Sequence, residues 1–129
     1  MYLDDRPNGR VVSAEYNTKC KVVLMTDGEL YKDYFIQVGQ TSKNVMLAIL
    51  KYMECDLNTI CVGGDTLDLL VGHTGYSEQT IRDNLRKLHP MLEKTGVRGE
   101  YIVNPMFATK GNEKAVWDMY EEIEQRVNN

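Results

Sequence analysis

The sequence contains no long apolar run. Its apolar stretches are far shorter than the roughly 18 residues that a helix needs to cross a membrane. The first residues lack the basic start and apolar stretch of a secretory signal, and the last residues carry no prenylation pattern. We therefore expect a cytoplasmic protein without a membrane partner.

Cysteine and histidine are scarce. The chain has 3 cysteines and 2 histidines, and none of the cysteines shows C-x-x-C spacing. An odd number of cysteines without that spacing is typical of reduced thiols rather than of a disulfide framework. A zinc site built from Cys55, Cys61, His73 and His89 would match the spacing of no zinc module. We expect reduced cysteines, Cys20 included, and no bound metal.

The motifs of common enzymes are also missing. No glycine-rich loop precedes Lys-Ser or Lys-Thr, so a nucleotide-binding P-loop is not indicated. His73 and His89 do not form the His-hydrophobe-His metal motif of rolling-circle nicking enzymes. Tyr76 or Tyr101 could be a nicking nucleophile on chemical grounds, but a core or phosphate-contacting role is favoured for both. We expect no enzymatic activity and no cofactor.

The net charge of −4 is distributed unevenly along the chain. Residues 1–75 carry 7 basic and 10 acidic side chains, residues 76–98 carry 5 and 3, and residues 99–129 carry 3 and 6. Only the middle segment is positive. Because phosphate groups are neutralised locally, this distribution matters more than the sum. An acidic chain of this kind is compatible with nucleic-acid binding at its basic segment.

The N-terminal part is predicted to form strands. Residues 11–16 and 21–25 are rich in β-branched side chains, and Asp27-Gly28 is a strong signal for a hairpin turn. This turn leads into a third strand-like segment at residues 30–38. We expect a small antiparallel sheet.

A first helix should follow these strands. Thr41 or Ser42 can cap it, and its apolar residues fall on one face at helical spacing: Val45, Ile49, Leu50, Tyr52 and Met53. Residues 58–62 are predicted to form a short strand, and two glycines follow it.

Residues 66–88 have the pattern of a helix-turn-helix. Asp65 can cap the first of these helices, which should end near Gly75. The next helix begins after a capping Ser77 and has one apolar face, formed by Ile81, Leu85 and Leu88.

A β-hairpin is predicted directly after these helices. Pro90 ends the preceding helix, because helical backbone is disfavoured in the residue before a proline. The hairpin strands are residues 91–94 and 100–103, and the strand at residues 58–62 would pair with them. Helix, turn, helix and hairpin in this order are typical of a winged helix, which binds duplex DNA in the major groove.

We therefore predict an α+β fold: a winged helix-turn-helix with a small N-terminal antiparallel β-sheet and a C-terminal helix. At 129 residues the chain has the size of one domain. Residues 1–40 are expected to form a β-hairpin region packed on the core, residues 41–111 the winged helix, and residues 112–129 an amphipathic helix.

The third helix is the candidate reading helix. Gln79 could form two bonds to adenine, Arg82 could bind guanine, and Thr80 could contact a thymine methyl group or a phosphate. Arg86 and Lys87 would lie one turn later, at phosphates. The hairpin loop would add further cations at the adjacent groove. The predicted DNA-binding residues are Ser77, Gln79, Thr80, Arg82, Arg86, Lys87, Lys94 and Arg98.

The C-terminal helix has an apolar stripe opposite an acidic face. Asn112 can cap this helix, and the stripe consists of Val116, Met119, Tyr120, Ile123 and Val127. The stripe must be buried, either on its own domain or against a second copy of the chain in a two-fold homodimer. The predicted dimerisation residues are Val116, Tyr120, Ile123 and Val127.

The end of the hairpin resembles a known family. The sequence from Arg98 to Pro105, followed by Phe107 and Lys110-Gly111, is similar to the R-G-x-Y-x-x-N-P-x-x-F-x-x-G ending of RepL-type plasmid replication and maintenance proteins and related phage proteins. Residues 34–38 resemble the short strand that precedes the first helix in that family. The resemblance covers residues 34–111, and residues 98–111 are its specific part.

This resemblance implies a winged helix that serves the replication or maintenance of plasmid or phage DNA, or its control. Its reading role would fall on Ser77 to Arg86. A transcriptional repressor would use the same chemistry. A protein-interaction or virion-associated module that lacks DNA binding is the alternative from another class, and its partners would be replication or virion proteins.

Overall fold

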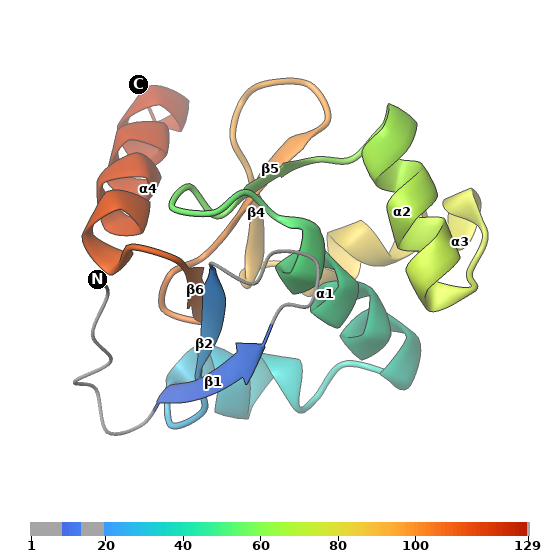
Figure 1. Cartoon of the computed structure of the whole chain (residues 1–129), viewed down its shortest axis with the longest axis horizontal. Helices are drawn as coiled ribbons and strands as arrows, with labels where there is room; N and C mark the ends of the chain where they lie inside the picture. Colours follow the sequence, from blue (N-terminus) through green and yellow to red (C-terminus); the bar gives the residue numbers. More distant parts are fainter. Residues whose placement is uncertain (1–8, 14–19, 129) are drawn as a thin grey trace.

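The computed structural model describes residues 9–13 and 20–128, and the side chains of residues 20–128. These residues form an α+β arrangement of short helices and two small antiparallel sheets (Figure 1). The elements are β1 (Gly9–Ser13), β2 (Lys21–Met25), the π-helical turn η1 (Leu30–Phe35), α1 (Gln40–Tyr52), β3 (Thr59–Cys61), α2 (Gly64–Thr74), α3 (Glu78–Leu85), the 3-10 turn η2 (Arg86–Leu88), β4 (Leu92–Lys94), β5 (Glu100–Val103), β6 (Ala108–Lys110) and α4 (Glu113–Val127).

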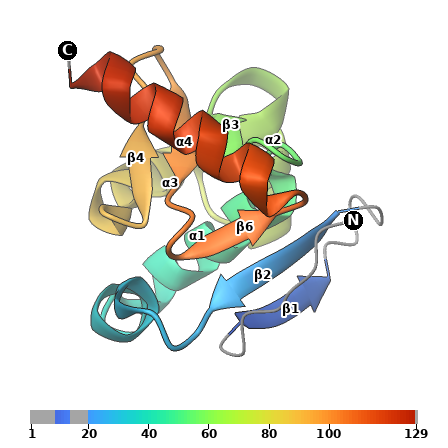
Figure 2. The ribbon, with the colours of Figure 1, turned by 90° about the vertical axis from the view of Figure 1, so that its left-hand side faces the viewer.

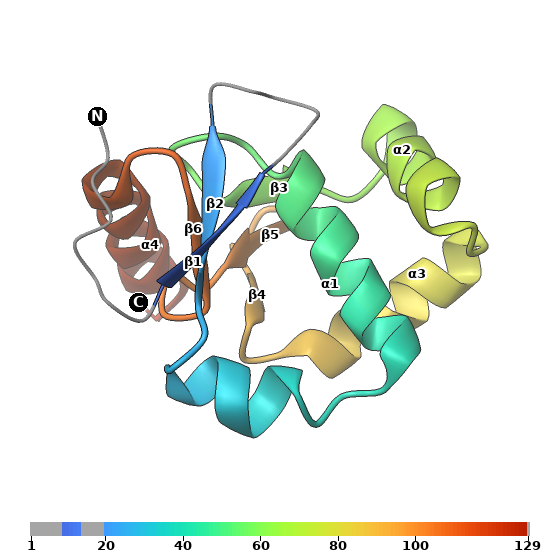
Figure 3. The ribbon, with the colours of Figure 1, turned by 60° about the horizontal axis from the view of Figure 1, so that its bottom comes forward.

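Each sheet has three strands, in the order β1-β2-β6 and β3-β5-β4. The register places Val23 opposite Thr109 in the first sheet and Ile60 opposite Tyr101 in the second. Figure 2 shows β1, β2 and β6 side by side, with α4 crossing in front of the sheets. α1 lies between the sheets and the pair formed by α2 and α3 (Figure 3). The helix-turn-helix segment and α4 therefore lie on different sides of the molecule.

α1 supplies the centre of the core, as its apolar spacing predicts. Val45, Ile49 and Leu50 are buried, and Met53 is buried directly after the helix. They belong to one apolar cluster with residues of α2, α3, η2 and the second sheet. A smaller cluster joins Ile102 of β5 to α4. The predicted strand at residues 58–62 is confirmed as β3, and it pairs with β5 of the hairpin as expected.

The strand predicted at residues 30–38 is wrong, because this segment forms the turn η1. Its backbone closes helically, with the Ile36 amide donating to the Tyr31 carbonyl at 3.1 Å. Tyr31 and Phe35 stack at 5.4 Å between ring centroids, and Phe35 packs on Phe107 at 5.3 Å. In a strand Tyr31 and Phe35 would share a face but lie about 13 Å apart, whereas a helical turn stacks the two rings on each other.

Two of the predicted helix caps are also wrong. α1 begins after Gly39, so Thr41 and Ser42 lie within its first turn, and α2 begins after Gly63, with Asp65 in its first turn. The caps at Ser77 and Asn112 are confirmed. The Ser77 Oγ accepts a hydrogen bond from the Thr80 amide at 3.2 Å, and the Asn112 Oδ1 accepts one from the Ala115 amide at 2.9 Å.

Cys20 and Cys55 form a disulfide, so the expectation of reduced cysteines is wrong for this pair. Their Cα atoms lie 6.1 Å apart although 35 positions separate them in the chain. The pairing of β2 with β6 brings them together, because the Asp56 amide donates to the Lys110 carbonyl at 2.8 Å next to this pair of strands. Cys61 is free and exposed.

Asn58 joins the two sheets. This residue is fully buried in the turn between α1 and β3. Its Nδ2 donates to the carbonyls of Val103 in β5 and Ala108 in β6, at 3.0 and 2.8 Å, and its Oδ1 accepts from the Lys110 amide at 3.0 Å. Asn58 has a φ of 61°, a left-handed conformation that asparagine tolerates better than most residues.

Replacing Asn58 with alanine should lower the free energy of unfolding by about 3 kcal/mol, because three backbone groups in a buried place lose their partner. Chemical denaturation measures this difference. Leu57→Ala is the matched control, since Leu57 is the neighbouring residue and is 37% exposed; its loss should stay below about 1 kcal/mol. Equal losses for the two variants would show that the Asn58 bonds do not join the sheets.

Candidate nucleic-acid interface

α3 is fixed to α1 through both apolar and polar contacts. Ile81, Leu85 and Leu88 are buried, as predicted. Between them lies Asn84, which is 6% exposed; its Oδ1 accepts a hydrogen bond from the Ser42 hydroxyl at 2.6 Å. The Asn84 Nδ2 also donates to the Thr80 carbonyl in the preceding turn. These contacts fix which face of α3 points outward.

Hydrogen bonds also hold the turn between α2 and α3. Gly75 ends α2 in the left-handed conformation, with a φ of 78°. The Thr74 hydroxyl donates to the Leu70 carbonyl at 2.8 Å and accepts from the Tyr76 amide at 3.1 Å. The Tyr76 hydroxyl in turn accepts from the Asn44 side chain of α1 at 2.8 Å. Tyr76 is therefore a structural residue that ties this turn to α1.

The structure places most of the predicted reading residues on the outer face of α3 and η2. Gln79, Arg82, Arg86 and Lys87 are exposed. Ser77 and Thr80 are engaged with each other, since their hydroxyl oxygens lie 3.0 Å apart and Ser77 caps the helix. The role of Ser77 in this structure is thus the cap.

Asp83 occupies the centre of that outer face. The Gln79 Nε2 donates to the Asp83 Oδ1 at 2.7 Å, and the Arg86 Nη2 lies 3.8 Å from the same oxygen. Both partners of this ion pair are solvated, with side-chain exposures of 81% and 48%, so the pair contributes little to stability. Within the part of the chain that the structure describes, Arg82 and Lys87 make no ion pair.

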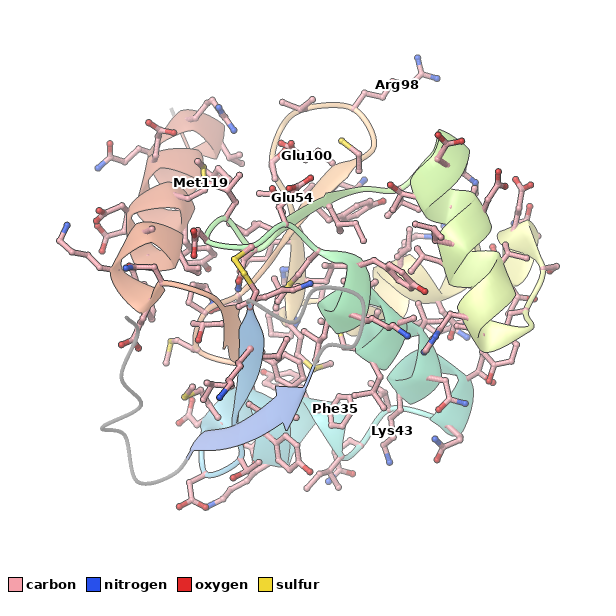
Figure 4. The ribbon with its side chains drawn as sticks, viewed as in Figure 1. Phe35, Lys43, Glu54, Arg98, Glu100 and Met119 are labelled. Carbon is pink, nitrogen blue, oxygen red and sulfur yellow. A yellow bond between two sulfur atoms is a disulfide. The ribbon has the colours of Figure 1, made fainter. Side chains whose placement is uncertain are left out.

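The other two predicted cations lie at the end of β4 and in the β4–β5 loop. Lys94 and Arg98 are exposed, and Figure 4 shows Arg98 projecting from the tip of this loop into solvent. The loop is anchored by the fully buried Thr95, whose hydroxyl donates to the Glu100 carboxylate at 2.7 Å and accepts from the Val97 amide at 3.2 Å. Gly99 turns the chain with a φ of 78°. The loop is thus tied to β5 through Glu100, while its cation Arg98 is exposed.

α4 packs on its own chain. Val116, Tyr120 and Ile123 are buried, whereas Val127 is 49% exposed. The Tyr120 hydroxyl donates to the Glu93 carboxylate of β4 at 2.6 Å. Burial, and next the hydrogen bond to Glu93, raises the pKa of Tyr120 well above its usual range. Three of the four residues predicted to form a dimer contact are therefore already buried within the single chain, and the homodimer stays a prediction.

The histidines and tyrosines considered as metal ligands or nucleophiles do not lie together in one site. Tyr52 and His73 form an edge-to-face contact at 5.8 Å, while His89 is exposed on its own. Among residues 9–13 and 20–128 no group of histidine, cysteine or acidic side chains could hold a metal ion. Tyr101 is partly buried within β5 and packs against the core.

The buried position of Lys110 is not indicated by any local sequence pattern. This lysine is 1% exposed in β6, and its Nζ donates to the carbonyls of Lys51 and Met53 at the end of α1, at 2.6 and 2.8 Å. Burial lowers the pKa of Lys110, while the charge of Glu54 acts in the opposite direction. A cavity of about 190 Å³ adjoins it, lined by Tyr52, Met53, Glu54, Cys55, Thr66, Leu69 and Lys110.

Comparisons with protein-family models, with curated protein sequences and with solved structures found no match for this chain. No helix in the described ranges is both long enough and apolar enough to span a membrane.

Replacing Ile123 with aspartate should destabilise the monomer by about 4 kcal/mol, because a charge would enter a buried apolar site. Val127→Asp is the control on the same stripe, and because Val127 is half exposed it should change the free energy of unfolding by less than about 1 kcal/mol. Denaturation and sedimentation of both variants give the answer. A folded Ile123→Asp protein that had only lost self-association would support dimerisation through α4 instead.

Proposed function

We propose that residues 40–103 form a winged-helix domain and that the chain binds duplex DNA through it. The order α1, β3, α2, α3, β4, β5 supports this proposal, as does the strand order β3-β5-β4, in which the strand before the helix pair pairs with the hairpin. In a winged helix the last helix of such a unit enters the major groove, and the hairpin loop contacts the neighbouring backbone.

The exposed face of α3 is the observation that carries the proposal. Its buried face is fixed by apolar contacts and by Asn84, so the outer side chains start from a rigid frame. Arg82 has the length and the free guanidinium to bind guanine O6 and N7, and Gln79 can bind adenine with its carbonyl and its second N–H. Arg86 and Lys87 then face phosphates, and Lys94 and Arg98 reach the adjacent groove.

Charge supports this orientation on DNA. Of the three segments compared, only residues 76–98 are net positive, whereas α4 carries acidic residues along its outer face. DNA would be attracted to α3 and the loop and repelled from α4. The biological role that we propose is replication, maintenance or their control on a plasmid or phage; a transcriptional repressor would hold its site by the same contacts.

Asp83 favours a second candidate function. It contacts both Gln79 and Arg86, and a carboxylate at the centre of α3 opposes the approach of phosphate. A protein-interaction module, among them a virion-associated one, would accommodate this arrangement on its surface. The two candidate functions differ in whether removing the Arg82 side chain weakens binding of the protein to DNA.

Replacing Arg82 with alanine should weaken binding to a specific site by about 1 to 3 kcal/mol, while binding to random DNA changes little, because only a base contact distinguishes the two. Fluorescence anisotropy against the DNA that flanks the gene, at two salt concentrations, measures both. Lys114→Ala is the control: Lys114 lies on α4 in a solvated ion pair with Asp118, and its loss removes one positive charge without touching α3.

The pattern of losses separates the possibilities. A loss that is equal for specific and random DNA would make Arg82 a phosphate contact. Two outcomes would contradict the proposal and favour the protein-interaction module. One is equal DNA affinity of the Arg82→Ala and Lys114→Ala proteins, and the other is a wild-type protein that binds no duplex DNA even at low salt.

A further inference from the structure

The two cysteines of the Cys20–Cys55 disulfide differ in exposure. Cys20 directly precedes β2 and is 7% exposed, whereas Cys55, in the turn after α1, is partly exposed. Cys55 lines the 190 Å³ cavity at the end of α1, and Cys20 does not. Figure 4 shows the disulfide near the N-terminal end of β2. A small molecule in the cavity therefore contacts Cys55 and not Cys20.

We propose that this disulfide is a thiol-exchange site, at which a small aminothiol attacks Cys55 from the cavity. The incoming thiolate forms a new S–S bond with the Cys55 Sγ, the Cys20–Cys55 bond breaks, and its electron pair leaves on the Cys20 Sγ, which takes up a proton. A second aminothiol can then attack the bound one, releasing Cys55 and one molecule of aminothiol disulfide. Two thiols thereby reduce the protein disulfide by two electrons.

The charges around the cavity favour a cationic thiol. Glu54 lines the cavity and is exposed, and a carboxylate oxygen of Asp56 lies 3.5 Å from the Cys55 Sγ. Lys110 is the cation of the cavity, but its ammonium group already donates to two carbonyls at the end of α1. An ammonium group on the incoming thiol would thus lie near the Glu54 carboxylate of the cavity lining, and the same carboxylate would repel an anionic thiol.

The surrounding fold accommodates both redox states. Once released, the Cys55 thiol can donate a hydrogen bond to the Asp56 carboxylate beside it. Gly111 faces this pair closely: a side chain there would lie 2.8 Å from the Cys55 Sγ. The turn itself is held independently of the disulfide by the Asn58 hydrogen bonds and by the Asp56 amide, which donates to the Lys110 carbonyl. The reduced protein should therefore stay folded.

The test uses the full chain with Cys61→Ser, which removes the free exposed thiol. The oxidised protein is treated with cysteamine, quenched with acid, alkylated and mapped by mass spectrometry. We expect the first mixed disulfide on Cys55 at least about 10-fold more often than on Cys20, because attack follows access. 2-Mercaptoethanesulfonate, compared at equal thiolate concentration, should react several-fold more slowly. Circular dichroism should show the reduced protein folded.

Two variants supply a second measurement. Cys20→Ala leaves Cys55 as the thiol and Cys55→Ala leaves Cys20, both with Cys61→Ser, and each is treated with cystamine. Cys55 should form its mixed disulfide at least about 10-fold faster than Cys20. Three outcomes would overturn the proposal. They are adducts formed equally on Cys20 and Cys55, equal reaction rates for cysteamine and 2-mercaptoethanesulfonate, and a rate of disulfide reduction that rises with denaturant concentration.

Discussion

The amide side chain of Asn58 holds together parts of the fold that share no strand. The sheets β1-β2-β6 and β3-β5-β4 are separate ladders, and the Nδ2 of Asn58 donates to β5 of one and to the carbonyl of Ala108, in β6, of the other. Lys110 adds a second tie, because its ammonium group binds the last carbonyls of α1. Ser42 of α1 donates a hydrogen bond to Asn84 of α3. The position of the outer face of α3 therefore depends, through α1, on the contacts of Asn58 and Lys110.

Helical periodicity made most of the helices predictable, and side-chain chemistry made two caps predictable. The stripes of α1, α3 and α4 recur at helical spacing, and Ser77 and Asn112 accept from the amides three residues later. The strand predicted at residues 30–38 was wrong because its aromatic content suits a strand, whereas the turn allows Phe35 to stack on Tyr31 and to pack on the distant Phe107. β6 and the Cys20–Cys55 bond depend on contacts between distant segments, which local patterns do not carry.

For the candidate site, sequence spacing identified the exposed side chains of α3 but not what holds them. The contact of Asn84 with Ser42 links positions 42 residues apart, so no local pattern indicates it. The residues that carry the resemblance have structural reasons of their own: Gly99 and Gly111 have φ of 78° and 89°, and Phe107 is fully buried. This part of the pattern therefore describes how the hairpin and β6 are built, and the DNA-binding proposal depends on α3.

The most direct test of the account is a nuclear magnetic resonance titration of the isotopically labelled chain with duplex DNA that flanks the gene, at low and moderate salt. The account predicts that the amide signals of residues 77–87 and 94–99 shift together and saturably, that the signals of α4 do not, and that raising the salt weakens binding steeply. Shifts centred on α4 or on the cavity at the end of α1, or no shifts at low salt, would contradict it.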